Sequence, residues 1–126
     1  MLHFLGSGLA LDVEEVLEWD EGPILFTARD FEGQRWLVAE VDRRGTRTAW
    51  LCTPQSPHTI EGVRSGQADV RDAVRHSANG TVEVITLDAN EVVEDQVLLC
   101  RDVPEKYLPA PGWRVEHVET APLTGT

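Results

Sequence analysis

What this chain lacks already excludes several classes of protein. It has no run of roughly eighteen apolar residues, the length that a membrane-spanning helix needs. The short apolar start, residues 1–5, has neither a basic leader nor the long hydrophobic stretch of an export signal. Its two cysteines, Cys52 and Cys100, both lie in apolar segments, where a free thiol behaves as a small buried hydrophobe. We therefore expect a reduced, cytoplasmic protein with no membrane partner.

Motifs for catalysis and metal binding are also missing. The four histidines never occur in HxH or HExxH spacing, and the two cysteines stand far apart, so no metal site is expected. No glycine-rich phosphate loop is present, and Ser56, which precedes Pro57, lacks the Gly-x-Ser-x-Gly elbow of a hydrolase. Adjacent carboxylates such as Glu94 and Asp95 project differently and are more typical of a solvated face than of an acid–base couple. No cofactor is expected.

The negative charge is concentrated at the two ends of the chain. The net charge is −11: residues 1–22 carry six acids and no base, residues 23–80 seven acids and eight arginines, and residues 81–126 nine acids and three bases. Nucleic acid is excluded as a partner, because its binding draws on Lys and Arg that neutralise phosphates. Two interpretations of the acidity stay open, a basic protein partner and simple solubility.

The clearest structural pattern is an antiparallel meander between Pro23 and Thr53. Three runs alternate apolar and polar residues: 24–28, 36–41 and 48–52. Short connections containing Gly33 and Gly45 separate them, and glycine supplies the positive φ that hairpin turns need. The meander predicts a sheet scaffold and exposes no reactive group.

Two short helices are expected after the third meander strand. Ser56 can cap a helix that begins at Pro57 and ends at Gly66, and residues 70–74 have helical spacing. Residues 81–87 and 96–101 are predicted strands, joined by an acidic loop over 88–95. The fold class is therefore α+β, with a mostly antiparallel sheet of four to six strands.

The two ends of the chain are harder to interpret. Residues 11–20 fit either a strand with a bulge at Glu15 and Val16 or a helix, and we favour the strand because a turn into the meander follows directly. Beyond Val118 little can be buried. We expect one domain over residues 1–118 and a flexible tail over 119–126.

Several segments, taken together, resemble a known family. In order and spacing, the segments 21–26, 50–56, 65–66 and 70–73 are similar to those of small bacterial domains known only as a domain of unknown function. The resemblance covers roughly residues 20–75 and fades in the acidic C-terminal third. It implies a stand-alone bacterial domain of mixed strands and helices, and it implies no activity and no ligand.

The functional candidates follow from charge and aromatic content. Trp and Arg are enriched at protein interfaces, and an acidic flank suits a basic partner. The predicted partner-binding residues are Trp36, Arg43, Arg44, Glu14, Glu15 and Glu18. The preferred function is a non-catalytic protein-binding module of accessory, regulatory or immunity type. The alternatives are a small enzyme that assembles Cys52 or Cys100 with His58 or His76, and a small-molecule sensor.

Overall fold

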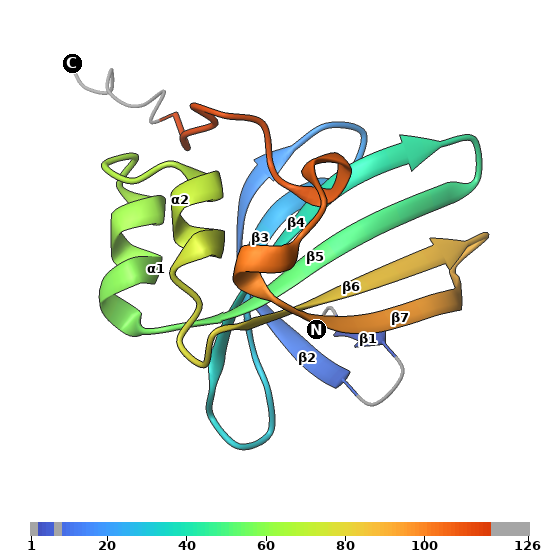
Figure 1. Ribbon diagram of the computed structural model, residues 1–126, viewed down its shortest axis with the longest axis horizontal. Coiled ribbons are helices and arrows are strands. Elements are labelled where there is room, and N and C mark those ends of the chain that lie inside the picture. The colour runs from blue at the N-terminus through green and yellow to red at the C-terminus, as the bar shows by residue number, and fades with distance from the viewer. Residues whose placement is uncertain (1–2, 7–8, 117–126) are drawn as a thin grey trace, which may run out of the picture.

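The protein folds around one antiparallel sheet whose strands follow one another in chain order (Figure 1). The computed structural model describes the backbone of residues 3–6 and 9–116 and the side chains of residues 10–116. The seven strands are β1 His3–Gly6, β2 Leu9–Trp19, β3 Pro23–Arg29, β4 Arg35–Arg44, β5 Arg47–Gln55, β6 Thr81–Asp88 and β7 Glu91–Leu99. The helices are α1 Pro57–Arg64 and α2 Val70–Arg75, and two 3₁₀ turns follow β7, η1 Cys100–Asp102 and η2 Glu105–Tyr107.

The α+β character is confirmed, and the predicted number of strands is wrong. The sheet has seven strands rather than four to six. The helices follow β5, which is the fifth strand of the chain and the third of the meander, since the hairpin of β1 and β2 precedes the meander. The strand interpretation of residues 11–20 is confirmed by β2, and its register against β3 shifts between Val13 and Glu15 and again between Val16 and Glu18. These irregularities accommodate the residues that break the alternation.

The loop expected over residues 88–95 is also corrected. β7 begins at Glu91, so the connection from β6 is a tight turn through Ala89 and Asn90. Both turn residues have positive φ, 51° and 71°, as a two-residue hairpin requires. The sequence analysis missed this turn because tight hairpin turns are usually marked by Asn-Gly or Asp-Gly, and here the two turn residues are Ala89 and Asn90.

Local sequence explains the two helices. The Ser56 hydroxyl accepts a hydrogen bond from the Thr59 amide at 3.2 Å, with Pro57 at the first helical position. The Asp69 carboxylate likewise accepts from the Asp72 amide at 2.7 Å and caps α2. Each cap satisfies a backbone donor that the first turn of a helix leaves open. The predicted start of the first helix is therefore confirmed.

Alternation along the strands divides the core between two faces of the sheet. On the helix face, buried Leu25, Leu37 and Ala39 pack against apolar residues of α1 and α2. On the opposite face, Phe26, Val38, Cys52 and Ile85 belong to one buried cluster with Leu11 and Ala28. Adjacent strand residues therefore belong to different clusters, as a period of two requires.

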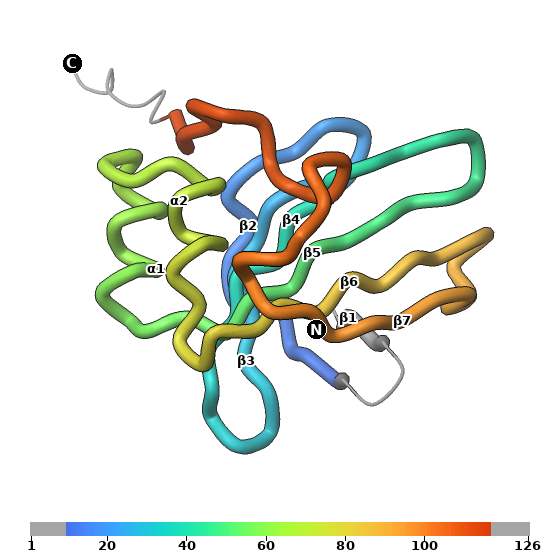
Figure 2. The backbone as a smooth tube through the Cα atoms, in the orientation of Figure 1, coloured from blue at the N-terminus to red at the C-terminus, as the bar shows by residue number. Residues whose placement is uncertain are grey.

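The segment after β7 crosses the helix face. Figure 2 shows residues 100–116 running from β7 across the sheet to the N-terminal end of α2. The Val70 amide donates to the Trp113 carbonyl at 2.8 Å, and the Arg71 guanidinium donates to the Pro109 carbonyl at 2.7 Å. The predicted tail, 119–126, and its boundary at residue 118 lie outside the described residues. Within the described part, no helix is long and apolar enough to cross a membrane.

Candidate functional site

The predicted acidic residues of β2 all contact other parts of the chain. Glu14 bridges two arginines, with Oε2 2.9 Å from Arg29 Nε and Oε1 3.2 Å from Arg35 Nε. Glu15 Oε1 lies 2.7 Å from Arg64 Nε on α1. Glu18 accepts a hydrogen bond of 3.4 Å from the indole of Trp113. These carboxylates therefore join β2 to β3, β4, α1 and the C-terminal segment.

The predicted Trp and Arg residues of β4 are also engaged within the chain. The Trp36 indole donates to Asp30 Oδ2 at 3.1 Å. Arg43 lies 2.9 Å from Glu40 and also donates to the Asp20 carbonyl. Arg44 pairs with Asp42 at 3.2 Å, yet its side chain is 80% exposed. The structure thus places Glu14, Glu15 and Glu18 on one strand and Trp36, Arg43 and Arg44 on another, with β3 between them.

Cys52, one of the two thiols of the enzyme alternative, lies in the core and not in the helical segment that contains the histidines. Cys52 is fully buried in the cluster opposite the helices, whereas His58 lies on α1 and His76 directly follows α2. Burial raises the pKa of the Cys52 thiol, and the negative charges of Glu83 and Asp95 raise it further. Both effects disfavour the reactive thiolate. Between residues 10 and 116, no hydrogen bond joins either thiol to a histidine; Cys100 Sγ lies 3.5 Å from the Arg75 carbonyl.

A carboxyl pair on β6 and β7 was missed by the sequence analysis. Glu83 pairs in register with Cys52 on one side and Val97 on the other, and Asp95 pairs with Ile85, so the two carboxyls share the face opposite the helices. Burial, a hydrogen bond to Asp95 and its negative charge raise the pKa of Glu83 to about 8. Near neutral pH Glu83 is therefore mostly protonated. Only the strand register brings Glu83 and Asp95 together, so no local motif could have found them.

Strand β7 forms one edge of the sheet and carries most of the exposed apolar side chains. Among residues 10–116, six large apolar side chains are exposed, and four of them lie on β7: Val92, Val93, Val97 and Leu99. The sheet order gives β7 one neighbour, β6. Residues 81–99 contain five acidic residues and no basic one. We call this surface the β7 edge.

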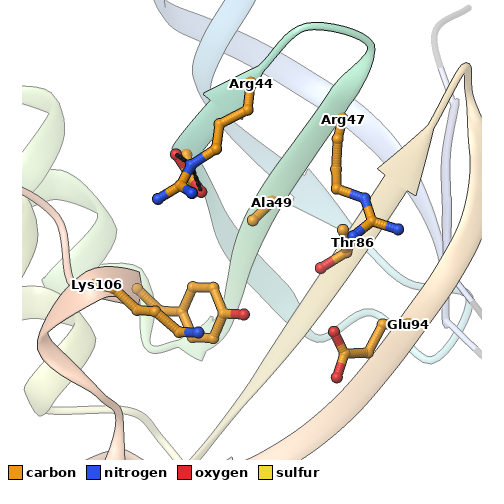
Figure 3. A pocket seen from close by; sticks show the side chains of 8 residues that line it. Arg44, Arg47, Ala49, Thr86, Glu94 and Lys106 are labelled. Atoms are coloured by element: carbon orange, nitrogen blue, oxygen red, sulfur yellow. Dashed lines mark hydrogen bonds and ion pairs between the residues drawn. The ribbon is translucent and has the colours of Figure 1, made fainter.

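A polar pocket lies on the helix face, beside the far end of the β4–β5 hairpin. Its volume is about 240 Å³. Its lining comes from five elements: Asp42, Arg44, Arg47, Ala49, Thr86, Glu94, Lys106 and Tyr107. Figure 3 shows Arg44 and Arg47 above the hollow, with Lys106 and Glu94 on its two sides. The ammonium of Lys106 lies 4.8 Å from the centre of the Tyr107 ring. We call this the hairpin pocket.

Comparison with known proteins identifies no relative. No family model, no curated protein and no solved structure matches the chain. Within the described residues, no group of three or more His, Cys, Asp or Glu side chains is placed to hold a metal ion. The geometry of the chain itself gives three candidate sites, the β7 edge, the carboxyl pair and the hairpin pocket.

Proposed function

We propose that this protein is a non-catalytic protein-binding module that captures a basic, extended segment of its partner along the β7 edge. The observation that carries the proposal is the concentration of exposed apolar side chains on this one edge strand. An edge strand presents backbone amides and carbonyls to an incoming strand, and proteins that do not use such an edge commonly protect it with Lys, Pro or a covering element. β7 contains neither Lys nor Pro.

Charge indicates the chemistry of the partner. Glu91 and Glu94 lie exposed on β7 itself, and Asp88 precedes the turn that leads into it. Arg47 lies 4.0 Å from Asp88, a long contact, and the acids of β7 form no ion pair with any residue between 10 and 116. A partner strand that alternates apolar and basic side chains would cover the exposed valines and meet the carboxylates. The sequence also predicted a basic partner but placed it on the carboxylates of β2. Those carboxylates contact other parts of the chain, so we place the partner on β7 instead.

The remaining expectations form part of the same proposal. A cytoplasmic location is supported by two thiols that form no disulfide, one buried in the core and one half-buried. Membership of the bacterial family of unknown function is supported by the segments in residues 20–75 and would leave the function open. An accessory, regulatory or immunity role is compatible with a module that binds and does not react.

The experiment combines capture with a map of the contact. Tagged protein is used to capture its partner from the native host, and hydrogen exchange then compares the free protein with the complex. The test variant is the double substitution Val97→Lys and Leu99→Lys, which places repelling charges on the edge. The matched control is Trp19→Lys, because Trp19 is equally exposed but lies on β2.

The proposal expects a stoichiometric partner whose binding slows exchange along β7. The double variant should lose the partner and Trp19→Lys should keep it, while both fold normally because the changed side chains are exposed. Association should slow as salt rises, since the Debye length falls from about 30 Å at 0.01 M to about 8 Å at physiological ionic strength. Protection on another surface, or equal capture by the double variant, would refute the β7 edge as the binding surface.

A further inference from the structure

We propose that the hairpin pocket binds a small zwitterion, with a free α-amino acid as the chemical class of ligand. The pocket shares Glu94 with β7, but Val97 and Leu99, the exposed apolar side chains that test the proposed function, do not line it. Glu94 pairs in register with Thr86 and faces the helix side of the sheet, whereas Val97 pairs with Glu83 on the opposite side. Either proposal can therefore fail without the other.

The lining of the pocket carries three cations that can receive a negative group. Arg44, Arg47 and Lys106 all line it. Arg44 is already paired with Asp42 at 3.2 Å, but Arg47 has its nearest carboxylate, Asp88, at 4.0 Å. Lys106 has no ion pair among residues 10–116 and lies over the ring of Tyr107. Lys106 is thus without a carboxylate partner among these residues and Arg47 has only a long contact, so both can meet a carboxylate, and an arginine guanidinium can bind one through two parallel hydrogen bonds.

Glu94, across the hollow from Lys106, adds a negative charge to the lining. The Glu94 carboxylate lines the pocket and forms no ion pair with any described residue. Figure 3 shows Glu94 and Lys106 facing each other across the hollow rather than touching. Glu94 and Lys106 form no ion pair with each other, and this leaves room between them for a ligand that carries an ammonium and a carboxylate. A carboxylate would lie toward Arg47 and Lys106, and an ammonium toward Glu94.

Size and lining narrow the class further. About 240 Å³ corresponds to roughly eight water molecules at about 30 Å³ each, below the range of about 300 to 1,000 Å³ typical of sites for drug-sized ligands. A small amino acid suits a space of this size. Thr86 adds a hydroxyl between the charged sides, and Ala49 leaves the floor uncrowded. Tyr107 supplies an aromatic surface for the aliphatic part of the ligand.

The chain offers an unusually direct reporter, because Lys106 is its only lysine. Reductive methylation with ¹³C-formaldehyde labels Lys106 and the terminal amine and keeps the lysine charge. The probes are the twenty L-amino acids at millimolar concentration, followed by the N-acetyl and carboxamide forms of any that bind. We expect at least one amino acid to shift the Lys106 methyl signal in a saturable way. Both blocked forms should bind at least about tenfold more weakly, the equivalent of about 1.4 kcal/mol, because each lacks one of the two charges.

Variants test the two sides of the pocket separately. Glu94→Gln and Lys106→Met should each weaken binding at least about tenfold, measured by backbone amide shifts of ¹⁵N-labelled protein. Glu32→Gln removes the same charge on the exposed β3–β4 turn and should bind as the parent does. The proposal is overturned if no amino acid shifts the signal, if a blocked form binds as tightly as the free one, or if both pocket variants bind normally.

Discussion

The carboxyl pair on β6 and β7 makes the stability of this fold depend on pH in an unusual direction. The pKa of Glu83 is raised from its ordinary value of 4.5 to about 8 in the folded protein. Between these two values the folded state holds a proton that the unfolded state has released. The protonated Glu83 therefore contributes its full share to the free energy of unfolding below pH 4.5. This contribution decreases as the pH rises from 4.5 to about 8, and above about pH 8 it no longer changes. An acid stabilised by an ion pair would show the opposite slope.

The size of the effect follows from the environment of Glu83. For a fully buried group the interval from 4.5 to about 8 would correspond to about 5 kcal/mol, at about 1.4 kcal/mol per pH unit. Glu83 is only half-buried, so solvent screens much of this cost. We expect the free energy of unfolding to fall by on the order of 1–2 kcal/mol between about pH 5 and pH 8.

The assay is urea unfolding of the parent and of Glu83→Gln at several pH values across this interval. The glutamine amide can still donate to Asp95 but does not titrate, so the variant should lose this slope and exceed the parent in stability at about pH 8. Glu91→Gln, an exposed substitution on β7, is the charge-matched control and should follow the parent. Equal slopes in the parent and Glu83→Gln would show that this carboxyl is not protonated in the folded state.

Two further predictions concern the core and the thiols. Leu51→Ala should lower the free energy of unfolding by about 2–5 kcal/mol in a denaturant titration, because Leu51 of β5 is fully buried in a cluster with Val74 of α2 and Val82 and Val84 of β6. A loss below about 1 kcal/mol would contradict this packing. In native protein a disulfide exchange reagent should modify half-buried Cys100 well before Cys52, whose pKa is raised and whose side chain is fully covered. Denaturation should then release two thiols in total, and rapid modification of native Cys52 would contradict its place in the core.

Local signals were sufficient for the elements that depend on nearby residues. The alternation over 24–28, 36–41 and 48–52 predicted β3, β4 and β5, because neighbouring strand residues face opposite sides of a sheet. Ser56 and Pro57 predicted the start of α1, since a cap and its donors lie within one turn. The same reasoning missed β1, and it placed the start of β7 too late because Ala89-Asn90 is not a strong turn signal.

The sequence by itself determined the acidic charge, the meander and the capped helices, all of which follow from composition or from contacts within a few residues. Only the tertiary structure decided the sites. Glu83 and Asp95 meet because β6 and β7 pair in one register, and a slip of one residue would turn their side chains to the other face. The hairpin pocket draws Arg47, Glu94 and Lys106 from three separate elements. Such groupings depend on strand register and on the path of the C-terminal segment across the sheet, which no short stretch of sequence encodes.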